Sequence, residues 1–150
     1  MKYDSTKDTL THIKRVGELL GDVIDNLDQR AIKHDQSKLE DPEKETFDKF
    51  TPLLKDSTYG SDEYKGFLKS MGVALEHHYK NNSHHPEHYE KGISGMDLFD
   101  VIEMLFDWKA ATERHDNGDI RKSLIHNKLR FNISDQLNSI LKNTVDRMNW

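Results

Sequence analysis

The sequence predicts an all-α protein in which five to seven helices form a single-domain bundle over residues 1–150. Apolar residues recur at intervals of three and four in several long segments, which is the period of an amphipathic helix. No run of alternating apolar and polar residues indicates a β-hairpin. A chain of this length fits one domain and can bury a core without disulfide bonds.

The first predicted helix covers about residues 6 to 28. Its apolar stripe consists of Leu10, Ile13, Val16, Leu19, Leu20, Val23, Ile24 and Leu27. A short connection over residues 28–38 follows. The sequence Asp41-Pro42-Glu43 then offers an N-cap, a proline at the first helical position and an acid in the first turn. We expect a second helix to begin there.

Three further helical regions follow. Residues 57–64 form a predicted loop, with Ser61 as the N-cap of a helix that runs into the first histidines of a cluster. After a loop at 81–95, Ser94 and Asp97 have the spacing of a capping box for the next helix. The segment 115–119 predicts a break, and one or two helices follow from residue 120 to about 145. The apolar residues of this last region can pack internally, which we favour, or against a second copy in a homo-oligomer: Ile133, Leu137, Ile140, Leu141 and Val145.

Composition excludes several classes of function. The net charge is -5, and the bases are interleaved with acids, so the chain has no electrostatic footprint for duplex nucleic acid. Because there is no cysteine, any metal must be held by histidine and carboxylate. We find neither a signal peptide nor a run of eighteen apolar residues, and therefore expect a cytoplasmic protein that does not associate with membranes.

Five of the nine histidines lie within residues 77–89. Histidine is the commonest metal ligand, so the tract indicates either a metal site or a solvated polar loop. His78 continues the stripe Phe67, Met71 and Ala74 at helical spacing, which points its imidazole inward, whereas His77 is rotated by about 100°. A turn at residues 82–83 could bring His78, His84 and His85 around one ion.

Other candidate ligands lie outside the tract. His34 and Asp35 are adjacent, so their side chains leave the backbone about 100° apart and could hold an ion from two directions. Asp107 lies between two aromatic residues in the most apolar stretch of the chain, where a carboxylate needs a partner. For Asp100 and Glu103, on the same predicted helix, we favour a solvated acidic stripe.

In order, these residues resemble the ligand series of the HD-domain superfamily of metal-dependent phosphohydrolases. The series is His12, the HDxxK motif of residues 34–38, His78, His84-His85-x-Glu87 and Asp107. The added histidines are similar to those of the two-metal branches, although the Gly-Tyr-Pro signature of the cyclic-dinucleotide branch is absent. The chain also resembles a family of small uncharacterised proteins from bacteria and their phages, with the motifs HDxSK, HxxxNxHHxE and EMxxDW.

The resemblance implies an HD-like domain with one or two divalent transition-metal ions, of Fe, Mn, Co, Ni or Zn. It assigns His12, His34, Asp35 and Asp107 to one ion, and Asp35, His78, His84 and His85 to a second. Lys38 and Arg15 would bind phosphoryl oxygens, and Glu87 would fix the tautomer of a histidine. The implied activity is hydrolysis of a small phosphorylated molecule of the nucleotide type by metal-activated water.

Two alternatives stay open at this point. The same ligands could build a non-catalytic, metal-stabilised binding module, for example a phage or bacterial accessory protein that sequesters a nucleotide or a host factor. The chain could also be a plain helical bundle whose histidine-rich loop holds no metal. Metal content separates the last from the other two, and turnover separates the enzyme from the binding module.

Overall fold

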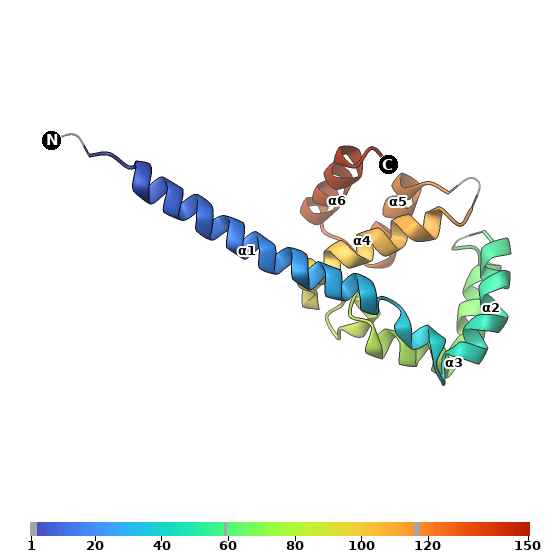
Figure 1. The fold of residues 1–150 in the computed structure, drawn as a ribbon. Coiled ribbons are helices and arrows are strands. Elements are labelled where there is room, and N and C mark those ends of the chain that lie inside the picture. Colours follow the sequence, from blue (N-terminus) through green and yellow to red (C-terminus); the bar gives the residue numbers. More distant parts are fainter. Residues whose placement is uncertain (1–2, 59, 116–117) are drawn as a thin grey trace. The chain divides into compact units, whose positions relative to one another are not determined.

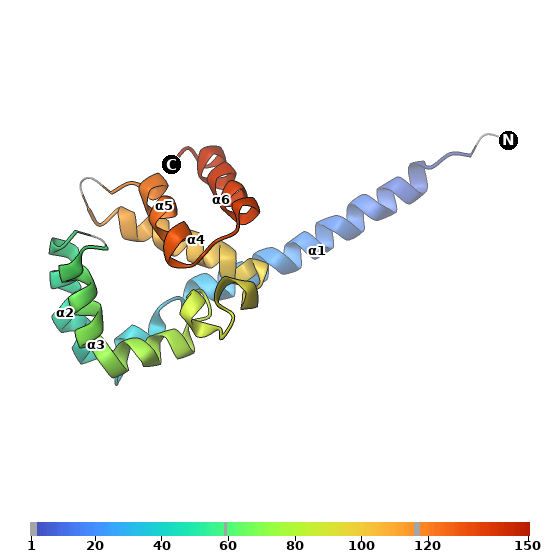
Figure 2. The ribbon, with the colours of Figure 1, turned by 180° about the vertical axis from the view of Figure 1, so that it is seen from behind.

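The computed structural model describes residues 3–58, 60–115 and 118–150, and it divides the chain into two compact units, Met1–His34 and Asp35–Trp150. Throughout these described ranges the regular elements are helical, six of them are α-helices, and no strand occurs (Figures 1 and 2). The all-α prediction is therefore confirmed, and the helix count lies within the predicted range. A single domain over residues 1–150 stays a prediction, and each unit is described by itself below.

The first unit consists of one long helix, α1 (Thr6–Lys33), drawn in blue in Figure 1. It ends five residues later than predicted, because residues 28–33 continue the helix although the regular apolar stripe stops at Leu27. Arg30 and Lys33 lie in its last turn, where positive charge interacts favourably with the helix dipole. The backbone N–H of His34 donates to the carbonyl of Arg30 at 2.8 Å and closes the helix.

The second unit opens with a short 3-10 helix, η1 (Gln36–Leu39), followed by α2 (Lys44–Asp56) and α3 (Asp62–Asn81), which lie side by side (Figures 1 and 2). The prediction that Pro42 is the first helical residue is wrong. The N–H of Lys44 donates to the carbonyl of Glu40 at 2.9 Å, so Pro42 lies inside a turn before the helix. Ser61 caps α3 as predicted, because its Oγ accepts from the N–H of Tyr64 at 3.1 Å.

The chain continues through two 3-10 helices, η2 (Pro86–His88) and η3 (Gly92–Gly95), to α4 (Leu98–Thr112). The capping box of α4 is formed by Asp97 and Asp100, so its prediction at Ser94 and Asp97 is wrong by three residues. The first residue of the box must immediately precede the helix, and here the helix begins at residue 98.

The last two helices are α5 (Ile120–Arg130) and α6 (Asp135–Arg147). Residues 116–117 of the predicted break lie outside the described residues. The core of the unit joins these two helices to α4 and contains Met104, Leu105, Trp108, Ile120, Leu124, Ile133, Leu141 and Val145. Internal packing of the C-terminal apolar residues is therefore confirmed for Ile133, Leu141 and Val145, whereas Ile140 is exposed. None of the described helices is long and apolar enough to cross a membrane.

Candidate metal centre

Four residues of the second unit place ligand atoms around one point. Asp35 precedes η1 in a left-handed backbone conformation (φ 57°), which aspartate tolerates better than most residues. His78 lies in the last turn of α3, buried as its stripe predicted. His84 and His85 follow in the segment between α3 and η2. One side-chain nitrogen or oxygen from each of the four lies within 4.8 Å of the others. We call this set the metal cluster.

The distances inside the metal cluster fit a single ion. His78 Nε2 lies 2.9 Å from His85 Nε2, and Asp35 Oδ1 lies 3.3 Å from His78 Nε2 and 3.6 Å from His84 Nε2. Ligands that bind one tetrahedral ion with bonds of about 2.0–2.1 Å stand roughly 3.3–3.4 Å apart. The separations span this value, so small movements of the side chains would complete a coordination sphere.

Two carboxylates, the buried Glu43 and the partly buried Glu103, contact the Nδ1 atoms of two of the histidines. Glu43 Oε2 lies 2.9 Å from His78 Nδ1, and Glu103 Oε1 lies 3.0 Å from His84 Nδ1. A carboxylate accepts hydrogen bonds, so each Nδ1 carries the proton and each Nε2 directs a lone pair toward the centre. Pairs of this kind orient metal-binding histidines in many proteins. The chemistry of the donor set therefore fits a bound cation.

The lowered pKa values of two histidines also favour metal binding. Burial, together with repulsion from the neighbouring His84 and His78, lowers the pKa of His85 to about 2. Burial, followed by the charge of Lys38, also lowers the pKa of His78, although nearby Asp35 and Glu43 oppose the shift. Both imidazoles are therefore neutral near pH 7, which is the form that binds metals.

Solvent reaches the metal cluster along one edge. The side chains of His78 and His84 are each 2% exposed, whereas those of Asp35 and Lys38 are 18% and 27% exposed. Lys38 Nζ lies 2.5 Å from Asp35 Oδ2. One carboxylate oxygen of Asp35 therefore faces the histidines, and the other faces the ammonium group of Lys38. A ligand approaching by this edge would meet the ammonium group beside the ion.

The remaining predicted ligands have different positions. Asp107 lies on α4, and one of its carboxylate oxygens is within 4.8 Å of a carboxylate oxygen of Asp35. This proximity is consistent with the predicted bridging role of Asp35. His34 is the C-cap of α1 and ends the first unit, and its role as a ligand stays a prediction. His12 lies 21 residues before the end of α1, which is about 32 Å along the helix axis. The first unit thus separates His12 from His34, contrary to the expectation that they hold one ion.

Two of the predicted supporting residues make other contacts. Arg15 is exposed on α1 and forms an ion pair with Glu18 at 3.0 Å, so α1 does not direct it toward His34. Glu87 forms an ion pair with Arg130 at 2.6 Å rather than a bond to a histidine of the metal cluster. Long side chains at exposed positions pair with nearby opposite charges, and sequence spacing alone does not reveal such pairs.

The interpretation of Asp100 and Glu103 as a solvated acidic stripe is wrong. Asp100 is 2% exposed and accepts from Ser83 Oγ at 2.7 Å, from the Tyr89 hydroxyl at 2.6 Å and from the N–H of Asp97 at 3.1 Å. Glu103 supports His84 as described above. Their spacing does place them on one helical face, but that face meets the histidine segment instead of solvent.

Sequence reasoning missed Glu43, which is completely buried. Besides His78 it contacts His77, whose Nδ1 lies 2.7 Å from Glu43 Oε1, and it accepts from Ser37 Oγ at 3.0 Å. Its position in the first turn of a predicted helix gave it an ordinary explanation as a dipole-stabilising acid.

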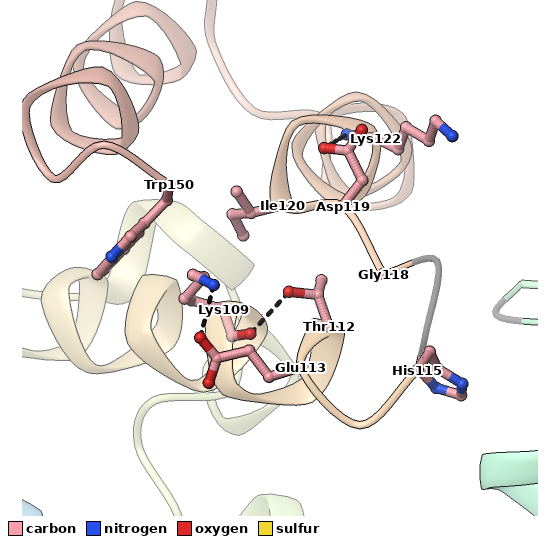
Figure 3. Close-up of a pocket in the computed structure, with 9 residues that line it drawn as sticks. All are labelled: Lys109, Thr112, Glu113, His115, Gly118, Asp119, Ile120, Lys122 and Trp150. Atoms are coloured by element: carbon pink, nitrogen blue, oxygen red, sulfur yellow. Dashed lines mark hydrogen bonds and ion pairs between the residues drawn. The ribbon is translucent and has the colours of Figure 1, made fainter.

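Two hollows of the second unit lie away from the metal cluster. One, of about 410 Å³, lies where α4 ends and α5 begins, and its lining includes Trp150 (Figure 3). Among its charged groups, Lys109 pairs with Glu113 at 2.6 Å, and Asp119 caps α5. The other, of about 500 Å³, is lined by residues of α3 and α5 and by Gly60. Neither is lined by a residue of the metal cluster, so we assign no catalytic role to them.

Comparison with known proteins gives a family but no activity. No curated protein and no solved structure matches the chain. A family model matches residues 1–147, which is nearly the whole sequence. The chain therefore belongs to DUF5662, a family of unknown function.

Proposed function

We propose that the chain binds a divalent transition-metal ion through Asp35, His78, His84 and His85, and that it hydrolyses a phosphoester of a small nucleotide-type molecule. The observation that carries the proposal is the convergence of three imidazole nitrogens and a carboxylate oxygen within 4.8 Å. A cation between these donor atoms can accept a lone pair from each of them. Iron, manganese, cobalt, nickel and zinc all accept such a ligand set.

The proposed reaction is attack of water on phosphorus, with cleavage of the bond to the leaving oxygen and transfer of a proton to that oxygen. A bound ion supplies a Lewis acid and lowers the pKa of a water molecule toward neutrality. Lys38 stands at the exposed edge, where its ammonium group can bind a phosphoryl oxygen while it stays close to Asp35. Asp107, a carboxylate oxygen of which lies within 4.8 Å of a carboxylate oxygen of Asp35, is the residue we propose for a second ion.

The order of residues supports this reaction class. Adjacent His34 and Asp35, the three later histidines and the final Asp107 follow the sequence pattern on which the resemblance to HD-domain phosphohydrolases rests.

A second candidate is a metal-stabilised binding module without catalysis. The observation that favours it is the number of protein ligands, because four ligands fill a tetrahedral zinc site and leave no position for water. In that case the ion would join η1, α3 and the following segment, and the exposed edge would only bind a phosphorylated ligand.

Metal analysis of protein purified without a histidine tag tests the site. We expect about one or two ions per chain in the wild type, and loss of the cluster ion in Asp35→Ala and His85→Ala. The matched control is His88→Ala, because His88 belongs to the same tract but is exposed and hydrogen-bonded to the carbonyl of Tyr79. Folded wild-type protein that takes up no metal would exclude both candidates.

A turnover screen separates the two candidates. Metal-loaded protein is incubated with nucleoside mono-, di- and triphosphates and cyclic nucleotides, with Mn²⁺, Co²⁺, Ni²⁺, Fe²⁺ and Mg²⁺ added separately. Hydrolysis that disappears in Asp35→Ala and falls in Lys38→Ala supports the enzyme. Protein that holds its metal and turns over none of these compounds favours the binding module.

A further inference from the structure

The apolar stripe of α1 has no partner inside its own unit, because that unit is a single helix. None of the 28 residues of α1 is buried. Leu10, Ile13, Leu20 and Ile24 are each between 56% and 65% exposed. Amphipathic helices gain most of their stability by packing the apolar face, so this stripe marks a contact surface.

We propose that α1 pairs in antiparallel orientation with α1 of a second copy of the chain. The charges along the helix favour this arrangement. Residues 7–15 carry three cations and one anion, whereas residues 22–30 carry three anions and one cation. An antiparallel pair sets these oppositely charged segments against each other at both ends, and a parallel pair in register sets like against like.

The apolar spacing defines a register for the pair. Positions 10, 13, 17, 20, 24 and 27 follow one another at intervals of three and four, which is the spacing of a helix seam. With Leu10 opposite Leu27 of the second copy, Ile13 faces Ile24 and Gly17 faces Leu20. Every layer of the seam is then apolar, and residues 7–15 of each copy lie opposite residues 22–30 of the other.

Gly17 gives independent support for a close neighbour. Glycine is a poor helix former, and its occurrence in the middle of a long helix needs a reason. Within the described residues of the first unit, no neighbouring heavy atom lies within 4 Å of the position that a Cβ of residue 17 would occupy, so that unit does not require glycine there. Opposite a leucine of a second helix, the missing side chain lets the two backbones approach each other.

A membrane surface fits the helix less well. Helices that lie on anionic membranes carry an excess of lysine and arginine on the polar face and aromatic residues on the apolar face. Over Thr6–Lys33 five acids match five bases, and the helix contains no aromatic residue other than His12. The charge pattern therefore matches a copy of itself better than it matches lipid.

Sedimentation equilibrium over a concentration series tests the proposal on the full chain. The wild type is expected at twice the chain mass of 17.5 kDa, and Ile24→Glu at the chain mass. Gln29→Glu is the matched control, because it adds the same charge on the opposite, polar face of α1 and should stay dimeric. Unchanged metal content in Ile24→Glu would show that the second unit stays folded. A monomeric wild type, or a dimeric Ile24→Glu, overturns the proposal.

Disulfide trapping tests orientation and register without adding a charge. The chain has no cysteine, so Leu10→Cys and Leu27→Cys each introduce a single thiol. In the proposed pair, position 10 of one copy is about 25 Å from position 10 of the other, far beyond the reach of a disulfide, whereas it lies opposite position 27. Mixed proteins should therefore crosslink on oxidation, and Leu10→Cys alone should not. Crosslinking of Leu10→Cys with itself, or no crosslinking of the mixture, contradicts the proposal. Neither experiment depends on the proposed hydrolase activity.

Discussion

Replacement of Glu43 by glutamine should weaken metal binding without removing a metal ligand. Glu43 is completely buried and presents one carboxylate oxygen to His77 Nδ1 and the other to His78 Nδ1 and Ser37 Oγ. A glutamine amide has only one acceptor oxygen, so one of these two sides must face an NH₂ group.

The expected loss follows from the two ways in which the amide can be placed. If its oxygen faces His78, the hydrogen bond loses its charge, which costs about 1 to 1.5 kcal/mol, or close to tenfold in affinity. If its NH₂ group faces His78, the imidazole proton must move to Nε2 and block the atom that faces the ion. We then expect a loss of up to about 100-fold.

Competition with a chelator of known affinity for Zn²⁺ or Co²⁺ measures this loss. The matched control is Glu45→Gln, the same chemical change at an exposed position in the first turn of α2. Thermal unfolding of both metal-free variants shows whether the fold is retained. Folded Glu43→Gln that binds metal within twofold of the wild type would refute the inferred orientation of His78 by Glu43.

Two further predictions concern the fold of the second unit. Burial and the hydrogen bond to Asp100 raise the pKa of Tyr89 to about 12. Between pH 10 and 12 the unfolded chain therefore releases a proton that the folded chain keeps. The free energy of unfolding should fall as the pH rises through this range. The phenolate absorbance of the native protein should therefore show a late transition that Tyr89→Phe lacks, and an unchanged titration curve in that variant would contradict the assignment. Leu124→Ala empties a fully buried site of the core and should lower the free energy of unfolding in urea by about 2 to 5 kcal/mol, whereas Ile125→Ala, at a neighbouring exposed position, should change it by less than about 1 kcal/mol. Equal effects of the two substitutions would show that the core is placed wrongly.

Sequence reasoning succeeded where a feature depends on neighbours in the chain. The burial of Ala74 and His78 follows from helical spacing, and the N-cap at Ser61 follows from its hydroxyl and the helix behind it. The metal cluster was predictable in part because three of its four residues lie within eight positions of one another, so a single turn suffices to join them.

It failed where a contact depends on packing between distant elements. Glu43 and His78 are 35 residues apart, and only the side-by-side arrangement of α2 and α3 brings them together. Glu103 meets His84 for a similar reason, because one face of α4 packs on the histidine segment. An isolated helix offers no information on whether an acidic face meets water or another element, so the solvated interpretation of α4 had no sequence signal against it.

The three hydrogen bonds accepted by Asp100 have a consequence for the energetics of the metal cluster. Two of them come from Ser83 and Tyr89, which flank His84 and His85 in the same segment. This buried carboxylate thereby anchors the backbone that carries two ligands to a rigid helix. The fold already restricts the conformations of His84 and His85, so binding of an ion would cost less conformational entropy than binding to a flexible segment.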